Sequence, residues 1–244
     1  MTDLTGKTIL VTGAASGIGW YTVQRILQSG GAVVAFDRSA DVQSLASDTV
    51  LPIVGSAEEP EDVAAAVSES QTRFGGLHGV VAAAGITRSG TADSMSLVDW
   101  NSVLSVNLTS VFLLAQAAFP ALRRSGGGGF VAVASQVGLV GYPENVAYCA
   151  AKGGVINLIR ALAVDVSAEG IRPVALCPGP IDTPMLRKGF EQTGEDMALA
   201  VSRVPAARIG TPQEIAAVAA FLLSDDAGFV TGATWTVDGG YTAQ

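Results

Sequence analysis

The sequence predicts an α/β fold, a doubly wound parallel sheet of about seven strands with helices on both faces. Short apolar runs alternate with longer helical runs along the whole chain. Residues 79–83 lack polar alternation, as expected of a strand buried on both sides. A glycine-rich turn joins the first strand to the first helix. Together these observations indicate a parallel sheet covered by helices on both faces.

The expected elements follow one another at regular intervals. Strands are expected at 8–11, 32–36, 51–54, 79–83, 130–134, 173–176 and 233–237, and helices at 17–29, 60–74, 100–122, 146–168 and 211–223. Gly170 is expected to end the helix at 146–168, and Pro173, which has no N–H, to begin its strand. Residues 183–205 interrupt the rhythm and are expected to form a substrate lid. With no repeat or linker, one domain spanning 1–244 is expected.

Composition excludes several classes of protein. The chain has 244 residues, of which 49% are hydrophobic and 15% charged, against a typical charged share of about 25%. This excludes a disordered chain and suggests apolar surface buried between subunits. The net charge of −8 argues against nucleic-acid binding, which needs a basic face.

No targeting or membrane segment is expected. The N-terminal residues lack a basic stretch followed by an apolar one, and the longest apolar runs fall short of the ~18 residues that a spanning helix needs. Cys149, Cys177 and His78 offer neither a disulfide framework nor a metal-binding spacing. His78 is expected to brace its loop. We therefore expect a cytoplasmic protein without a metal site.

The glycine-rich turn predicts a Rossmann-type dinucleotide site. Gly13, Gly17 and Gly19 follow the spacing G-x-x-x-G-x-G, with Ser16 and Ile18 in the same turn. Glycines let the backbone approach a pyrophosphate closely, and the helix N-terminus offers free N–H groups to it. The alternative is that the glycines only allow tight packing of the strand on the helix.

Asp37 indicates the choice of cofactor. It follows Gly19 by 18 residues, close to the ~20 expected for a carboxylate that binds the adenosine ribose. A carboxylate there would repel the 2′-phosphate of NADP. Arg38 could bind that phosphate, but the glycine turn holds no other basic residue. NAD is therefore expected rather than NADP, the alternative being that Asp37 is only a turn residue.

A tyrosine and a lysine form the candidate catalytic pair. Tyr148 and Lys152 lie four apart on a predicted helix and so share one face. The ammonium is expected to lower the pKa of the phenol from its usual ~10. Ser135 lies at the end of a buried strand, where sites gather in such sheets, and Asn107 interrupts an apolar helical stretch. The alternative is an exposed helix pair without catalytic function.

These motifs resemble those of the short-chain dehydrogenase/reductase family in its compact single-domain form. The resemblance covers nearly the whole chain, and its motifs are residues 12–19 (TGAASGIG), 106–108 (VNL), 134–138 (ASQVG), 148–152 (YCAAK) and 177–183 (CPGPIDT). It implies hydride transfer between a nicotinamide and an alcohol or carbonyl. By the same resemblance Tyr148 is the general acid/base, Ser135 holds the substrate oxygen, Lys152 binds the nicotinamide ribose and Asn107 positions a proton-relay water.

The resemblance also implies further contacts and an assembly. Pro178 and Gly179 would lie against the nicotinamide, while Ile181 and Thr183 would bind its carboxamide and the phosphate. A homotetramer would form through the two long helices and the last strand.

The chain departs from the family pattern in three places. Gly55-Ser56 replaces an aspartate, residues 82–85 (AAAG) replace an asparagine-rich turn, and Val174 replaces an asparagine. Backbone groups near Ser56, Ala83 and Gly85 are still expected to contact the cofactor.

By family analogy the substrate pocket is mainly apolar. Its expected walls are Ile86, Val137, Leu139, Tyr142, Met185 and Leu186, and the expected substrate contacts are Ser135, Val137, Tyr142, Tyr148 and Met185. Such a pocket suits a modest uncharged ketone or secondary alcohol, although several of these side chains could instead pack the lid.

Three functions stay open at this stage. The first is an NAD-dependent alcohol dehydrogenase or ketone reductase. The second is a 3-oxoacyl carrier-protein reductase using NADPH, against which Asp37 and the uncharged turn at 126–129 argue. The third is a non-catalytic dinucleotide sensor, against which the presence of all four catalytic residues argues.

Overall fold

The computed structural model describes residues 2–194 and 196–244. A seven-stranded sheet has the order β3-β2-β1-β4-β5-β6-β7. Its strands are β1 (Thr8–Thr12), β2 (Ala32–Asp37), β3 (Val50–Val54), β4 (Gly79–Ala82), β5 (Gly128–Val133), β6 (Ile171–Pro178) and β7 (Thr234–Val237). Every pair of neighbours is parallel. The predicted doubly wound sheet is confirmed.

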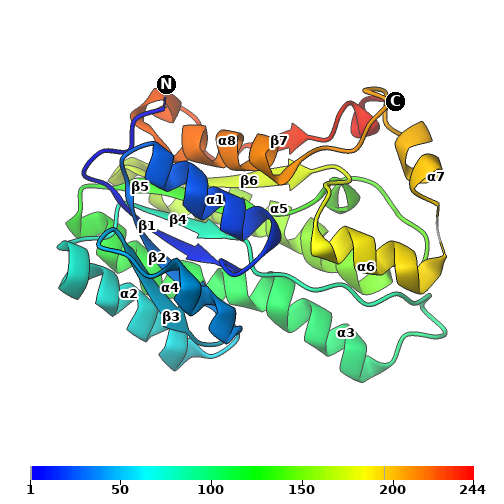
Figure 1. The fold of residues 1–244 in the computed structure, drawn as a ribbon, viewed down its shortest axis with the longest axis horizontal. Coiled ribbons are helices and arrows are strands. Elements are labelled where there is room, and N and C mark those ends of the chain that lie inside the picture. The colour runs from blue at the N-terminus through cyan, green and yellow to red at the C-terminus, as the bar shows by residue number, and fades with distance from the viewer. Residues whose placement is uncertain (1, 195) are drawn as a thin grey trace.

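Helices cover both faces of this sheet (Figure 1). The helices are α1 (Gly17–Gln28), α2 (Pro60–Phe74), α3 (Leu97–Leu104), α4 (Ser110–Arg124), α5 (Val146–Val166), α6 (Pro184–Thr193), α7 (Met197–Ser202) and α8 (Pro212–Leu223). One core cluster joins the sheet to α1 and α8, and a second joins it to α2, α4 and α5. Helices α6 and α7 lie at the end of the sheet where α1 begins. Both belong to the segment 183–205 that was predicted to form a lid.

Strand β1 shows how the sequence produces these two cores. Ile9 and Val11 belong to the cluster with α1 and α8, whereas Leu10 belongs to the opposite cluster. Because side chains alternate across a strand, a strand buried on both faces must be apolar at every position. This explains the unbroken apolar runs in the sequence.

The long helix expected at 100–122 differs from the prediction. It begins at Leu97 and ends at Arg124, with a π-helical segment at Ser105–Thr109 between α3 and α4. The continuous stretch Leu97–Arg124 is long and apolar enough to cross a membrane by length and composition alone. Half of its most apolar window is buried inside the fold, however, which is typical of a core helix.

Pro173 does not begin its strand, so that prediction was wrong. It is the third residue of β6, whose first residue is Ile171. The Pro173 carbonyl accepts a hydrogen bond from Gly232 N at 2.7 Å, which places its backbone on the β7 side. Because β7 begins only at Thr234, the N–H that the proline lacks is not needed for a hydrogen bond between the two strands.

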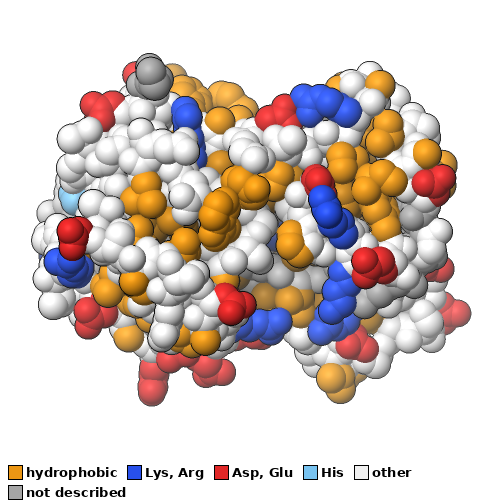
Figure 2. Space-filling view, viewed as in Figure 1, with side chains coloured by type: hydrophobic (Ala, Val, Ile, Leu, Met, Phe, Trp, Pro, Cys, Tyr) orange, Lys and Arg blue, Asp and Glu red, His pale blue; other side chains and the backbone are white. Residues whose placement is uncertain are grey.

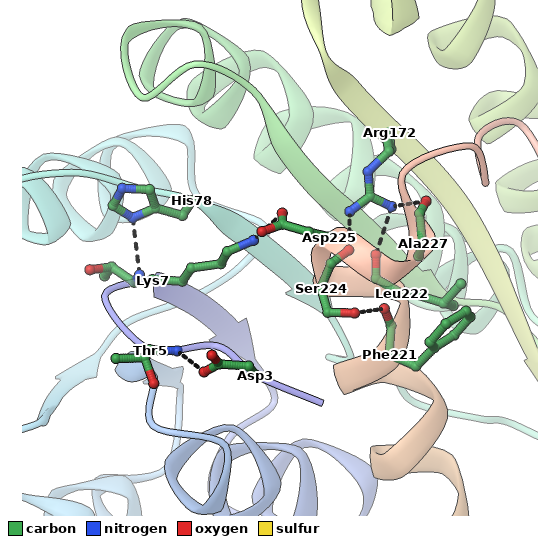
Figure 3. A network of polar contacts seen from close by, with 11 residues as sticks. Asp3, Thr5, Lys7, His78, Arg172, Phe221, Leu222, Ser224, Asp225 and Ala227 are labelled. Atoms are coloured by element: carbon green, nitrogen blue, oxygen red, sulfur yellow. Dashed lines mark hydrogen bonds and ion pairs between the residues drawn. The ribbon is translucent and has the colours of Figure 1, made fainter. Parts of the chain in front are cut away.

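A polar network fixes the edge of the molecule opposite α6 (Figure 3). Arg172 donates hydrogen bonds to the carbonyls of Leu222, Ser224 and Ala227, which end and follow α8. Lys7 pairs with Asp225 in the same network. His78 contacts the start of β1, where its Nδ1 accepts a hydrogen bond from Thr8 N at 3.0 Å.

Candidate active site

A cavity of about 430 Å³ opens at the carboxyl ends of the strands. Open parallel sheets bind ligands at this edge. Its lining includes these predicted residues: Gly13, Ser16, Gly17, Ile18, Gly19, Asp37, Ser56, Ala83, Gly85, Ser135, Val137, Tyr142, Tyr148, Lys152, Pro178, Gly179, Ile181, Thr183 and Met185. Asn107 is not in the lining and lies behind it. Segments from all along the sequence thus meet at one site.

The glycine turn is shaped as a cradle. Gly13 and Gly17 have φ values of +68° and +51°, which favour glycine. A Cβ added to Gly19 would lie 2.0 Å from the Gly13 carbonyl oxygen, so no side chain fits there. Ser16 precedes α1, and its side chain makes no capping hydrogen bond to the first turn. The exposed N–H groups and the bare backbone fit the pyrophosphate of a dinucleotide.

The turn after β4 is held without its family asparagine. Thr12 Oγ1 accepts hydrogen bonds from Ala83 N at 3.1 Å and Ala84 N at 3.2 Å. A Cβ on Gly13 would meet Ala84 N at 2.8 Å. The first and fourth strands therefore end in direct contact, and Ala83 reaches the cavity through its backbone.

Asp37 lies at the end of β2 with both carboxylate oxygens partnered. Oδ2 accepts a hydrogen bond from Ala15 N at 2.9 Å, and Oδ1 accepts one from Ser39 N at 2.8 Å. The carboxylate thus links the glycine turn to the turn after β2 while lining the cavity beside Arg38.

Ser135, Tyr148 and Lys152 come together on the other side of the cavity. Ser135 follows β5, and its Oγ accepts a hydrogen bond from Val137 N at 3.3 Å. Tyr148 and Lys152 share one face of α5, with the ammonium nitrogen 5.5 Å from the centre of the phenol ring. Lys152 Nζ donates to the Val133 carbonyl at 2.7 Å, which anchors α5 to the end of β5.

Burial governs the titration of this pair. Desolvation raises the pKa of Tyr148 to about 12, although a hydrogen bond with Ser135 acts in the opposite direction. Desolvation also lowers the pKa of Lys152 to about 8. The expectation of a lowered phenol pKa is therefore not met in the protein alone, because the loss of hydration disfavours the phenolate.

Asn107 lies just behind the cavity wall, in the π-helical segment. Its side chain is fully buried, and Nδ2 donates to the carbonyls of Ile86 at 2.8 Å and Val103 at 2.9 Å. Within the described part of the chain its Oδ1 has no hydrogen-bond partner. A Cβ on Gly85 would lie 2.9 Å from that oxygen and 3.8 Å from Lys152 Nζ. Only a glycine leaves space between the Asn107 carbonyl oxygen and the lysine.

The substrate end of the cavity is more polar than the sequence suggested. Ile86, Val137, Tyr142, Met185 and Leu186 line it as predicted, whereas Leu139 does not and is 40% exposed. The lining also includes residues that sequence reasoning missed: Thr87, Ser89, Gln136, Asn145, Phe190, Arg203 and Tyr241. Of these, only Gln136 carried a sequence signal, since it directly follows Ser135 in the 134–138 motif.

The α6–α7 segment forms one wall of this end. The Arg203 guanidinium carbon lies 5.8 Å from the centre of the Tyr142 ring, which joins the end of α7 to the loop before α5. Figure 2 shows the molecular face hollowed between the body and the side carrying α6 and α7, with apolar side chains beside the hollow.

The chain is similar to known oxidoreductases over nearly its full length. A family model described as enoyl-(acyl carrier protein) reductase matches residues 13–242. Cyclohexanol dehydrogenase of Acinetobacter sp. (strain SE19) is 39% identical over 98% of this chain and 96% of that protein. The 3-oxoacyl-(acyl-carrier-protein) reductase of Thermotoga maritima is 37% identical over 97% of this chain and 98% of that protein.

Solved structures agree with these sequence relatives. A short-chain type dehydrogenase/reductase from Mycobacterium marinum has a TM-score of 0.93 at 30% identity, covering 100% of this chain and 98% of that one. A structure from Beutenbergia cavernae with bound NADP has a TM-score of 0.93 at 31% identity, covering 100% and 99%. The chain belongs to the short-chain dehydrogenase/reductase family of oxidoreductases that use a nicotinamide cofactor, and its relatives include dehydrogenases that act on CH–OH groups.

Proposed function

We propose that the protein is an NAD-dependent dehydrogenase that interconverts a small secondary alcohol and its ketone. One observation carries this proposal: Ser135, Tyr148 and Lys152 line the same cavity as the glycine cradle. A bound nicotinamide would supply the carbon that accepts hydride from the alcohol. The similarity to a cyclohexanol dehydrogenase supports an alcohol as substrate.

The proton chemistry belongs to the chain's own side chains. Tyr148 takes the hydroxyl proton while Ser135 donates a hydrogen bond to the same oxygen and stabilises its developing charge. The ammonium of Lys152 favours the phenolate by its positive charge. Asn107 Oδ1, buried opposite the lysine across Gly85, is placed to hold the water that returns the proton to solvent.

Asp37 supports NAD as the cofactor. Its carboxylate is fixed by Ala15 N and Ser39 N, so it cannot turn away from a 2′-phosphate without losing two hydrogen bonds. Pro178, Gly179, Ile181 and Thr183 would bind the nicotinamide half, since they line the same cavity as Ser135 and Tyr148. Ser56, Ala83 and Gly85 would bind the adenosine half and the ribose through their backbone.

The lid and the assembly belong to the same proposal. Segment 183–205, which contains α6 and α7, would close over the substrate. Phe112 on α4 and Val164 on α5 are 47% and 86% exposed, which supports a homotetramer built through these helices. We also propose that the enzyme is cytoplasmic. Light scattering of the purified protein tests the proposed tetramer by measuring its oligomeric state.

The Tyr148→Phe variant tests the reaction. We expect kcat to fall by about 10²–10⁴, the usual contribution of a general acid or base, while the affinity for NAD, measured by fluorescence titration, is retained. Unchanged turnover contradicts the proposal. Assays of secondary alcohols with NAD and NADP in parallel test the cofactor, and a higher kcat/KM with NADP contradicts the role given to Asp37.

A second candidate is a 3-oxoacyl carrier-protein reductase, which the Thermotoga relative favours. Such an enzyme must reduce a 3-oxoacyl thioester with NADPH. Turnover of acetoacetyl thioesters with NADPH, without oxidation of simple secondary alcohols by NAD, would select this candidate.

A further inference from the structure

Residues 238–244 form a turn to which the proposed reaction assigns no role. Asp238 directly follows β7 and is only 9% exposed. Its Oδ1 accepts a hydrogen bond from Gly240 N at 3.0 Å. Its Oδ2 accepts two hydrogen bonds from Thr242, one from N at 2.9 Å and one from Oγ1 at 2.6 Å. One carboxylate therefore fixes the shape of these residues, which we call the 238–244 turn.

The carboxyl of Asp238 is charged at neutral pH. Burial raises its pKa, but the hydrogen bonds from Thr242 and Gly240 outweigh this effect and hold the pKa below its ordinary value. Hydrogen bonds to a charged acceptor are stronger than those between neutral groups. The 238–244 turn is thus held by strong local bonds.

The 238–244 turn contacts the end of the lid segment at residues 203–206. The Gly239 carbonyl accepts a hydrogen bond from Ala206 N at 3.0 Å. Gln244 Nε2 donates one to the Arg203 carbonyl at 2.9 Å. A Cβ on Gly239 would lie 2.6 Å from Val204 Cγ1, so only a glycine allows this close packing. The end of the chain accordingly lies beside α7 (Figure 1).

The lid segment itself contributes little to the core. Of the described side chains in 183–205, only those of Ala200 and Val204 are buried. Segments with few buried side chains open locally at a low cost in free energy. Val204 is one of the two, and it packs on the 238–244 turn. The position of this end of the lid therefore depends on the turn.

The same turn shapes the substrate end of the cavity. Tyr241 belongs to the turn and lines the cavity, and its N donates a hydrogen bond to the Asp238 carbonyl at 3.2 Å. Arg203, whose carbonyl the turn binds, also lines the cavity. Its guanidinium carbon lies 5.8 Å from the centre of the Tyr142 ring. Asp238 is not in this lining, yet it fixes the backbone beside two residues that are.

We propose that Asp238 is a positioning residue for substrate binding, which acts by folding the 238–244 turn that holds the end of the lid and places Tyr241 in the cavity wall. Without its acceptor oxygens, the turn and residues 203–206 must be ordered when the substrate binds, and that ordering lowers affinity. Turnover of bound substrate should hardly change, because Ser135 and Tyr148 lie at β5 and on α5. This inference rests on the proposed function and adds a determinant of substrate affinity to it.

The Asp238→Asn variant tests the inference. It keeps the size of the side chain but replaces one acceptor oxygen by a donor NH₂, which faces an N–H of Gly240 or Thr242 in either orientation. With saturating NAD we expect KM for cyclohexanol and for 2-butanol to rise at least about tenfold, the effect of a lost buried hydrogen bond. We expect kcat to stay within about threefold, since uniform binding is what is lost.

Amide hydrogen exchange, measured by mass spectrometry, provides a readout that does not depend on activity. In Asp238→Asn, peptides from residues 200–210 should exchange at least about tenfold faster, because the end of the lid opens more often. Peptides that cover β1 should exchange at the wild-type rate.

An aspartate elsewhere provides the control. Asp226 is exposed in the turn after α8 and does not line the cavity, so Asp226→Asn should keep the wild-type KM and exchange rates. Thr242→Val takes the place of Asp238→Asn if that variant lacks the far-UV circular dichroism spectrum of the wild type. It removes only the hydrogen bond from Oγ1, so KM should rise at least about threefold.

The outcomes separate this inference from the proposed function. An unchanged KM, unchanged exchange at 200–210, or a fall in kcat alone overturns the inference and leaves the alcohol dehydrogenase standing. Faster exchange in β1 as well would show a general loss of stability and would also overturn it. If the folded wild type oxidises neither alcohol with NAD, the proposed function fails, whereas the exchange rates still decide whether Asp238 holds the lid.

Discussion

Replacing Lys152 by methionine tests the electrostatics of the site. Lys152 Nζ lies 5.5 Å from the centre of the Tyr148 ring. At an effective dielectric constant of about 20, unit charges at this separation attract by about 3 kcal/mol. This corresponds to about 2 pKa units. We therefore expect Lys152→Met to raise the pKa of Tyr148 by about 2 units above its already raised value.

The rate should follow the fraction of phenolate. The pKa of Lys152 is lowered to about 8 by burial, so its amine is charged at neutral pH and favours the phenolate there. At pH 7 we expect kcat/KM for alcohol oxidation to fall about a hundredfold in Lys152→Met, equivalent to ~3 kcal/mol. The assay is the pH profile of kcat/KM with saturating NAD. The difference between the two proteins should shrink above about pH 8, where Lys152 of the wild type loses its charge.

An exposed lysine gives the matched control. Lys188 lies on α6, is exposed, and does not line the cavity, so Lys188→Met should keep the wild-type pH profile. A far-UV circular dichroism spectrum like that of the wild type would show that Lys152→Met is folded. An unchanged kcat/KM at pH 7 in a folded Lys152→Met would refute the reasoning, since the ammonium would then have no influence on the phenol.

Three further perturbations follow from the structure. Asp37→Asn should raise the ratio of kcat/KM with NADP to that with NAD at least about tenfold, or ~1.4 kcal/mol, and an unchanged ratio would contradict the assigned contact. Gly19→Ala places a Cβ 2.0 Å from the Gly13 carbonyl oxygen, so urea unfolding should show that the free energy of unfolding falls by about 2–4 kcal/mol. Gly189→Ala is the control, because nothing lies within 4 Å of its added Cβ, and its free energy of unfolding should hardly change. The pKa of His78 is lowered, mainly by burial and then by Lys7, so the unfolded chain binds the proton more tightly than the folded protein. The free energy of unfolding should therefore fall as the pH drops below 6.5, the usual pKa of histidine. His78→Gln should lose this part of the pH dependence, and equal slopes of stability against pH in both proteins would contradict the prediction.

The parts of the fold predicted from sequence are those set by local pattern. The strands and the glycine turn could be read because period, length and glycine spacing depend on neighbouring residues alone. The position of Pro173 could not, since a proline inside β6 is tolerated only because β7 begins at Thr234. That condition lies some sixty residues away in the chain.

The candidate site shows the same division. The pairing of Tyr148 with Lys152 follows from helix geometry, whereas the pKa of Tyr148 depends on burial by elements that are distant in the sequence. The polar lining contributed by Asn145 and Arg203 was missed because these residues follow no motif and are brought to the cavity only by the tertiary fold. The motifs predicted the candidate catalytic residues, whereas tertiary packing determines which other residues surround them.

The π-helical segment between α3 and α4 has a consequence for how this chain can change. Each residue of an α-helix turns the side chains that follow by about 100°. Deleting one residue from Ser105–Thr109 would restore α-helical winding, and it would rotate either Asn107 away from Gly85 or the apolar stripe of α4 away from the sheet. The length of this stretch is thus set by two demands at once, so insertions and deletions are not tolerable there.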